Sequence, residues 1–321
     1  MLAVGLRVGA FGQATPNIIR RNLLVMVLLV LSFQILTGNS GIISYGHVGF
    51  MAIGAYTSAL LTTPPAIKQS FIRDLPAFLA NGKFDFVLAP LIGAGVVFVI
   101  ALITGVPLAR LSGSAGALAT FAFLVMVNVV LSGWEGVTGG RRALYGVPLS
   151  ATPAWTAGLA AVGLVLARLF RDSPLGQTLR ATREDELAAR MVGVNVERVR
   201  LVASLLSGVY AGVAGVLFAH FLGEFSPQQF YLTLTINALT MLIVGHMTTT
   251  SGSLIGAVII TLIFEALRGV ETVASSLPRL PDLFGLAQIA IGLVLLFLMY
   301  FRLQGDLGRW ELDEHVSRPR S

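Results

Sequence analysis

Residues 171–200 read RDSPLGQTLRATREDELAARMVGVNVERVR and lie between two long apolar stretches, 153–170 and 199–222. A helix that crosses a membrane needs about 20 consecutive, mostly apolar residues. The two apolar stretches approach or exceed this length, whereas the charged segment, defined here as residues 171–198, is too polar to be buried in lipid. This part of the chain therefore predicts two membrane-spanning helices joined by a loop at the membrane surface.

The rest of the chain repeats this alternation of long apolar and short polar stretches. Of its 321 residues, 55% are hydrophobic and only 12% are charged, against about 25% charged residues in an average soluble domain. The candidate spans are 21–37, 47–63, 86–109, 113–132, 153–170, 199–222, 231–246, 252–268 and 284–302. The polar stretches between them are shorter than the roughly 40 residues that an independent core requires. We expect an all-α polytopic transmembrane helical bundle of about 8–10 spans, with residues 1–321 forming a single transmembrane domain.

The arginines indicate how this bundle lies in the membrane. Loops rich in arginine remain on the cytoplasmic side, and six arginines fall between residues 171 and 200. With this loop in the cytoplasm, nine full crossings place the N-terminus outside, whereas Arg20 and Arg21 before the first span favour the inside. The conflict predicts that one stretch does not cross fully, either the region 38–46 or the short stretch 231–246.

Within the charged segment, the residue pattern predicts a short helix over residues 183–192. Thr182 and Asp185 have the capping-box spacing, in which each side chain accepts a hydrogen bond from a backbone N–H at the start of the helix. Gly193 favours the left-handed conformation that ends a helix, and Asn195 favours the start of the next one. Ten residues of helix are about 15 Å long, which is the size of an element that fits a cleft.

One edge of this short helix is apolar and its flanks are charged. The apolar edge comprises Leu187, Ala188, Met191 and Val192. Glu186 and Arg190 are four residues apart, a favourable spacing for an ion pair. Such a helix fits either another protein or the lipid headgroup layer. Because Glu184, Asp185 and Glu186 would be repelled by anionic lipid, docking to a protein is the favoured interpretation.

The first span ends in a polar, glycine-rich sequence, GNSGIISYGH at residues 38–47. Glycine and asparagine favour helix ends, and a helix broken inside a membrane exposes backbone groups that can contact a polar solute. Unsatisfied backbone groups are costly in hydrocarbon, so such a break must face protein or a water-filled route. The side chains expected to line this route are Asn39, Ser40, Ser44, Tyr45 and His47. A plain turn between two helices at the membrane edge is the alternative.

The span 199–222 carries small residues at helical spacing. They form two stripes, Ser204, Gly208 and Gly212 on one side and Ser207, Ala211 and Gly215 on the other. Small residues let helix backbones approach closely in a membrane. We therefore expect this helix to be buried among the others.

Four regions of the sequence carry motifs that occur together. In the charged segment they are Pro174-x-Gly176, Arg180-Ala181-x-Arg183-Glu184, Glu186-x-Ala188-Ala189 and Gly193-x-Asn195. Elsewhere they are Gly41-x-x-Ser44-x-Gly46-His47 with Gly54-Ala55-Tyr56-Thr57, Thr138-Gly139-Gly140 with Gly146-x-Pro148, and residues 207–215 followed by Ser226-Pro227. Together they resemble the permease subunits of branched-chain amino acid ABC importers. Their order over residues 38–265 resembles that of the M-type permease.

This resemblance implies a multi-pass permease subunit of an ATP-driven importer in the bacterial inner membrane. It implies a second permease as heterodimer partner, two cytoplasmic ATPase subunits that bind ATP and Mg²⁺, and a periplasmic solute-binding protein. The residues that would couple this chain to an ATPase are Arg180, Ala181, Arg183, Glu184, Glu186, Ala188, Ala189, Gly193 and Asn195. Branched-chain amino acids are the solutes that the resemblance implies, with urea, short amides and aromatic acids left open.

The chain departs from this family at one turn. After the seventh span the family usually has Gly-Gly-x-Gly, and here the sequence is Gly245-His246-Met247-Thr248 with the next glycine at Gly252. Because Gly245 and Gly252 flank the segment, we expect a turn in this place.

Several activities are disfavoured by what the sequence lacks. Neither lysine, Lys68 or Lys83, lies in a phosphate-binding Gly-x-x-x-x-Gly-Lys-Ser/Thr loop, so ATP hydrolysis is expected in a separate subunit and none in this chain. Charges inside the spans are nearly absent, and the only carboxylates available there, Glu135 and Glu265, lie near span ends, which disfavours an ion-coupled carrier. Basic residues lie at span ends and no nucleic-acid module is visible. Without cysteine, and with four histidines that lack ligand spacing, no metal site is expected.

An intramembrane serine protease is a further alternative. Gly38-Asn39-Ser40-Gly41 matches the Gly-x-Ser-Gly nucleophile pattern, and His220 or His246 is a candidate base if its ring reaches the hydroxyl. This interpretation leaves the charged segment without a role.

Overall fold

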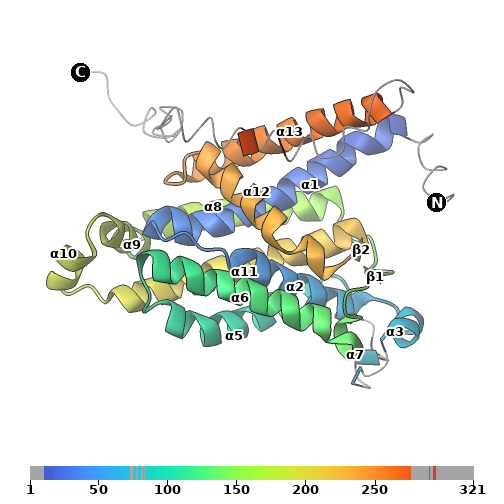
Figure 1. The fold of residues 1–321 in the computed structure, drawn as a ribbon, viewed down its shortest axis with the longest axis horizontal. Helices are drawn as coiled ribbons and strands as arrows, with labels where there is room; N and C mark the ends of the chain where they lie inside the picture. The colour runs from blue at the N-terminus through green and yellow to red at the C-terminus, as the bar shows by residue number, and fades with distance from the viewer. Residues whose placement is uncertain are drawn as a thin grey trace.

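A computed structural model describes residues 11–72, 75–76, 79–80, 82, 84–275, 289 and 292–293 of the chain. Over these residues the protein is a bundle of helices (Figure 1), as the sequence predicts. The strands described are two short ones, β1 (Leu144–Tyr145) and β2 (Glu224–Phe225), which pair antiparallel.

Six of the described helices are long and apolar enough to cross a membrane. These are α1 (Phe11–Phe33) with its extension η2 (Gln34–Gly38), α5 (Ala89–Leu108), α6 (Gly113–Gly133), α8 (Pro153–Asp172), α11 (Val196–Leu222) and α13 (Thr250–Ser275). The shorter elements are α2 (His47–Thr62), α3 (Pro65–Phe71), α7 (Glu135–Thr138), α9 (Pro174–Glu184), α10 (Glu186–Met191), η3 (Pro227–Gln229) and α12 (Leu232–Val244). The predicted span 284–302 lies outside the described residues, apart from three of them.

The helices from α1 to α13 that run along the bundle alternate in direction (Figure 1), with α9 and α10 at one end and the strands at the other. Arg21 near the start of α1 lies at the strand end, where its Nη1 is 3.5 Å from the carbonyl oxygen of Ala151 and its guanidinium lies over the ring of Phe221. The first described helix therefore begins opposite the charged segment. Of the two conflicting indications for the N-terminal side, this position disagrees with the one from Arg20 and Arg21, because Arg21 lies beside Ala151 and Phe221 of α11.

The two stretches suspected of incomplete crossing both follow this alternation. α12 has 13 residues and is about 20 Å long, shorter than the roughly 30 Å of a bilayer core. Its chain nevertheless runs from β2 at the strand end to Met247, whose carbonyl oxygen lies against Gly38 at the other end. α12 therefore runs along the bundle but is not among the six helices long enough to cross a membrane, and the incomplete crossing of this stretch stays a prediction.

α11 is the central helix of the bundle and packs against α1, α2 and α5. The side-chain amide oxygen of Asn195 accepts a hydrogen bond from the N–H of Arg198 at its start, and Gly223 ends it in the left-handed conformation. Its small residues bring α2 very close: a Cβ on Gly54 would meet the carbonyl oxygen of Gly212, and one on Gly215 would meet that of Met51. The predicted burial of this span is confirmed.

Candidate functional site

The charged segment folds into two short helices rather than one. α9 begins after Ser173, whose hydroxyl accepts a hydrogen bond from the N–H of Gly176 (3.2 Å), with Pro174 at the first helical position. Proline there is preorganised for a helix and loses no internal hydrogen bond. This early start places Thr182 inside α9, where its hydroxyl donates to the helix backbone. The predicted capping role of Thr182 is wrong, and so is the single helix over 183–192.

α10 has its own start and stop. The carboxylate of Asp185 accepts a hydrogen bond from the N–H of Ala188 (2.9 Å), so Asp185 is the cap of α10. Gly193 adopts a left-handed φ of 88° after the helix, and Asn195 caps α11. The predictions for Gly193 and Asn195 are confirmed.

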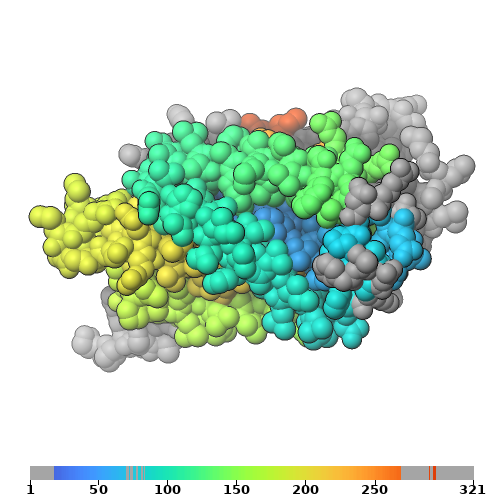
Figure 2. Space-filling model, turned by 90° about the horizontal axis from the view of Figure 1, so that it is seen from below, coloured from blue at the N-terminus to red at the C-terminus, as the bar shows by residue number. Residues whose placement is uncertain are grey.

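α10 projects beyond the bundle at one end (Figures 1 and 2) and presents an apolar tip. Leu187, Met191 and Val192 are 76%, 89% and 81% exposed. Ala188 is exposed beside them, whereas Ala189 is only 5% exposed and packs inward. All four residues of the predicted apolar edge are exposed, and its three large side chains, Leu187, Met191 and Val192, are called the tip from here on.

Glu186 faces the body of the protein. One of its carboxylate oxygens accepts a hydrogen bond from Arg190 (3.0 Å) and the other from Arg200 (2.7 Å) at the start of α11. The bond from Arg200, with a smaller contribution from Arg190, lowers the pKa of the Glu186 carboxyl below its usual value. The predicted pair of Glu186 with Arg190 is confirmed, and the buried pair with Arg200 is additional.

Arg183 at the end of α9 also points inward. Its Nη1 donates to the carbonyl oxygen of Gly38 (2.8 Å), and its side chain fills the space beside Gly41. The remaining predicted coupling residues of α9 are exposed (Ala181, Glu184) or half-buried (Arg180). The inward bond of Arg183 joins the charged segment to the region where the first span ends.

That region is a true break between two helices. α1 continues as the π-helix Gln34–Gly38, leaves helical geometry at Gly41, where φ is 73°, and resumes as α2 at His47. The amide of Asn39 donates to two carbonyl oxygens of the π-helix (3.0 and 3.1 Å), and the hydroxyl of Ser40 accepts from a nearby N–H. Both side chains therefore stabilise the break itself. The predicted break is confirmed.

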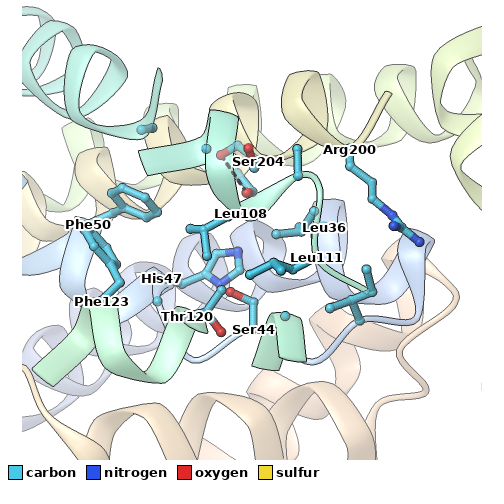
Figure 3. A pocket seen from close by; sticks show the side chains of 17 residues that line it. Leu36, Ser44, His47, Phe50, Leu108, Leu111, Thr120, Phe123, Arg200 and Ser204 are labelled. Atoms are coloured by element: carbon cyan, nitrogen blue, oxygen red, sulfur yellow. Dashed lines mark hydrogen bonds between the residues drawn. The ribbon is translucent and has the colours of Figure 1, made fainter. Parts of the chain in front are cut away.

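A pocket of about 50 Å³ lies beside the break, between α2, α5, α6 and α11 (Figure 3). Figure 2 shows the blue atoms of α2 at the bottom of the hollow between α5 and α6. The volume has room for a few water molecules. Its polar lining residues are Ser44, His47, Thr120, Arg200, Ser204 and Ser207, and its walls include Leu36, Phe50, Leu108, Leu111 and Phe123.

Of the predicted route residues, only Ser44 and His47 line this pocket. The ring of His47 also stacks on Phe33, with centroids 4.2 Å apart. Tyr45 does not line the pocket. Its backbone N–H donates to the hydroxyl of Thr120 (3.0 Å), which ties the break to α6. Asn39, Ser40 and Tyr45 thus hold the break, while Ser44 and His47 face the space next to it.

The α11 side of the pocket was not predicted from the sequence. Arg200, Ser204 and Ser207 are spaced by four and three residues, which places them on one helix face. Ser204 and Ser207 were interpreted only as small packing residues. Their combination with an arginine at the same spacing is the signal that could have indicated a polar wall.

The protease arrangement is not formed by His220. Its Nε2 lies 2.9 Å from the hydroxyl oxygen of Thr62 and its Nδ1 lies 2.8 Å from the carbonyl oxygen of Val216. Thr62 ends α2 at the strand end, whereas Ser40 precedes the start of α2. The ring of His246 lies against the hydroxyl of Thr248, at 3.0 Å. Among the described residues there is also no group of three or more potential metal ligands.

The turn that departs from the family pattern is present and tightly packed. A Cβ on Gly245 would meet the carbonyl oxygen of Gly252, and one on Gly252 would meet that of Gly245. His246 between them has a positive φ of 69°, a conformation that glycine adopts more easily. The expected turn is confirmed.

The structure is thus a polytopic helical membrane bundle with a broken first span, a small pocket beside the break and two short helices at one end. The chain belongs to the family described as branched-chain amino acid transport system / permease component, which it matches over residues 18–302.

Curated relatives agree with this assignment. The chain is 27% identical over 318 residues to the high-affinity branched-chain amino acid transport system permease protein LivM of Escherichia coli, covering 88% of this chain and 68% of that protein. It is 29% identical over 177 residues to the autoinducer 2 import system permease protein LsrC of Salmonella paratyphi B, covering 50% and 49%. It is 28% identical over 151 residues to LivH of Salmonella typhimurium, covering 47% and 45%. No solved structure matches the chain.

Membership of this family decides between the alternatives drawn from the sequence. The chain is a transport permease component of the bacterial inner membrane rather than a catalytic enzyme. The serine protease interpretation is therefore wrong, and Ser40 has its structural place in the break. The resemblance to M-type permeases is confirmed by the coverage of LivM.

Proposed function

We propose that this chain is the M-type permease subunit of an ATP-driven importer for branched-chain amino acids or related small solutes. It would pair with a second permease, receive solute from a periplasmic binding protein and couple to two cytoplasmic ATPase subunits that bind ATP and Mg²⁺. The relatives named for branched-chain amino acid transport support the solute class. The observation that supports coupling to the ATPase subunits is the exposed apolar tip of α10.

The tip is built for contact with a protein. Its three large apolar side chains are almost fully exposed on a helix outside the apolar spans, and Asp185 and Glu184 lie beside them. Exposed apolar groups of this kind mark interaction sites, and the neighbouring carboxylates disfavour burial in anionic lipid headgroups. ATP binding in the partner subunits would close them and move α10, and the helices joined to α10 would follow.

Docking can be tested by placing charge on the tip. Leu187→Asp combined with Met191→Asp should weaken association with the ATPase subunits by roughly thirtyfold, corresponding to about 2 kcal/mol for a central apolar contact. The measurement is retention of the ATPase subunits by the tagged permease complex during purification in detergent. Replacing Ala189 is unsuitable, because that side chain is buried and its enlargement would unpack α10.

Leu175→Asp is the matched control. Leu175 is 43% exposed on α9 but lies outside the tip, so the same chemical change there should leave association unchanged. Full retention of the ATPase subunits by the Leu187→Asp, Met191→Asp chain, with normal insertion in the membrane, would contradict docking through α10.

The solute class needs its own experiment. Proteoliposomes carrying the purified complex and its binding protein should accumulate labelled leucine in the presence of ATP, and excess valine or isoleucine should compete. Competition by urea, a short amide or benzoate in place of the aliphatic amino acids would assign the complex to the alternative solutes. Leucine uptake driven by an ion gradient without ATP would overturn the proposal.

A further inference from the structure

Besides the apolar packing of α9 through Leu179, which is fully buried, two polar links join the charged segment to the elements that line the pocket. Arg183 of α9 bonds the carbonyl oxygen of Gly38 in the break. Glu186 of α10 bonds Arg200 of α11. The break contributes Ser44 and His47 to the pocket, and α11 contributes Arg200 and Ser204.

The bond of Arg183 is directional and replaces a missing backbone partner. A π-helix bonds each N–H to a carbonyl five residues earlier and commonly marks a functional site within a longer helix. Gly38 is the last residue of this π-helix, and the chain leaves helical geometry at Gly41. The guanidinium therefore satisfies a carbonyl that lies where the helix ends. A charge-assisted bond of this kind is stronger than a neutral one.

The glycines explain how the arginine reaches this carbonyl. A Cβ on Gly41 would lie 2.9 Å from Cγ of Arg183, so a larger residue there would displace the arginine side chain. A Cβ on Gly38 would meet the carbonyl oxygen of Met247 in the turn before α13. The break, the end of α9 and this turn thus meet around two glycines.

The second link is of a different kind. Arg200 is 5% exposed and belongs to the long central helix α11. Its pair with Glu186 fixes α10 to an element that packs against α1, α2 and α5. α10 is therefore held to the rigid centre, while the preceding α9 holds the break.

We propose that Arg183 is a positioning residue that ties the pocket-lining break to α9, so that displacement of α9 moves the break and changes access of water to the pocket. Arg183 does not line the pocket and reaches it only through the break. This inference rests on the proposed function, because it needs an ATPase to move the segment. It assigns Arg183 and Glu186 an inward role, distinct from docking.

The absence of cysteine from the chain allows a clean reporter. Ser204→Cys places a single thiol in this subunit at the pocket wall, and the rate of its modification by 2-aminoethyl methanethiosulfonate reports access of water to the pocket. In the complete reconstituted complex, with any native cysteines of the partner subunits replaced, trapping with ATP, Mg²⁺ and vanadate should change this rate by about fivefold or more, a typical allosteric coupling.

Arg183→Met added to the reporter chain should reduce that change to less than about twofold, while the complex still assembles and hydrolyses ATP. Arg183→Lys, which retains a charged donor but not the planar fork, should give an intermediate change. Arg110→Met is the matched control, because Arg110 at the same end of the bundle is exposed and pairs with Glu197 (3.8 Å) away from the break. It should respond as the unsubstituted reporter does.

The outcomes separate the two proposals. Failure of the reporter chain to associate with any ATPase would contradict the proposed function. Normal association with an unchanged vanadate response in Arg183→Met would overturn the positioning role of Arg183 alone. If Arg183→Met prevents assembly, Arg183→Lys decides: an intermediate response supports the inference, and a response equal to that of the Arg110→Met control overturns it.

Discussion

The contact between α2 and α11 and the attachment of α9 and α10 are held by opposite kinds of interaction. Between α2 and α11, Gly54 and Gly215 bring the two backbones together with no room for a methyl group. At the other site, the hydrogen bond from Arg183 to Gly38 and the ion pair between Glu186 and Arg200 are the inward polar links described above. The first contact is a close approach of two backbones, whereas the second adds directional polar bonds to the buried apolar side chains of Leu179 and Ala189.

This difference has a consequence for movement. Close-packed interiors do not deform gradually, because small shifts produce clashes. Hydrogen bonds and ion pairs can break and re-form in a second arrangement, which is a common basis of switching. The α2–α11 contact therefore serves as the fixed frame, and the α9–α10 attachment is where displacement can be transmitted.

We expect the largest loss of stability from adding a methyl group at the contact between α2 and α11. Gly54→Ala places a Cβ against the carbonyl oxygen of Gly212, so α2 and α11 must separate, and overpacking of this kind costs about 3 kcal/mol. We expect a marked loss of monodisperse protein and a lower melting temperature, measured by size-exclusion chromatography of heated samples in detergent.

Gly95→Ala is the matched control for this change. Gly95 lies on α5 with open space where a Cβ would stand, and alanine is the better helix former by about 1 kcal/mol. It should be neutral or slightly stabilising. Equal melting temperatures for Gly54→Ala and Gly95→Ala would show that the frame is not tightly packed.

The sequence predicts the contact between α2 and α11 well, because the residues that indicate it lie close together in the chain. The stripes of small residues on 199–222 follow helical spacing, and in a membrane such spacing has few other uses. The break was also predictable, since Gly38, Asn39 and Gly41 disfavour a continuous helix. Hydropathy alone identified the long spans, and α2 and α12 are simply shorter than the bilayer core.

The sequence predicts the α9–α10 attachment poorly because its contacts are distant in the chain. Nothing near Arg183 indicates that it bonds Gly38, 145 positions away, and the pair of Glu186 with Arg200 competes with the local pair to Arg190. Thr182 looked like a cap because its spacing to Asp185 fits one, yet Ser173 and Pro174 had already started the helix. Two residues can thus compete to cap the same stretch of helix. Because α9 already begins after Ser173, Thr182 lies inside the helix and cannot cap it.

A smaller effect is expected from removing the charge of Glu186. Glu186→Gln keeps the shape of the side chain but deprives the buried guanidinium of Arg200 of its counter-charge. The loss should be about 1–2 kcal/mol, the range of hydrogen bonds to charged groups after allowance for partial exposure. Thermal unfolding of the detergent-solubilised chain at pH 7 measures it.

The pH dependence gives this prediction a direction. The folded pKa of Glu186 is lowered from its ordinary value of 4.5, so the folded state binds the proton less readily than the unfolded state does. Its contribution is complete above pH 4.5 and is lost as the pH falls through the lowered pKa. The stability difference between the native and Glu186→Gln chains should shrink over this window. A difference that stays constant below pH 4.5 would contradict the assigned ion pair.

We expect the smallest change in stability from the turn before α13. In this turn Met247 contacts the break and Gly245 packs against Gly252. His246 holds a left-handed backbone there, which costs about 1–2 kcal/mol for a residue with a Cβ. Glycine removes this strain but adds about 0.5–1 kcal/mol of unfolded-state entropy. His246→Gly should therefore be more stable than His246→Ala by up to about 1 kcal/mol, measured by thermal unfolding in the same detergent.

His246→Ala is the appropriate reference for this comparison, because both variants lose the contact between the imidazole and the hydroxyl of Thr248 and only the alanine keeps the Cβ. If His246→Ala is the more stable of the two, the backbone at this turn is not strained, and the departure from the family's glycine pattern costs the fold nothing. If His246→Gly is more stable, the histidine is retained against its conformational preference. The close packing of Gly245 against Gly252 then holds His246 in this conformation.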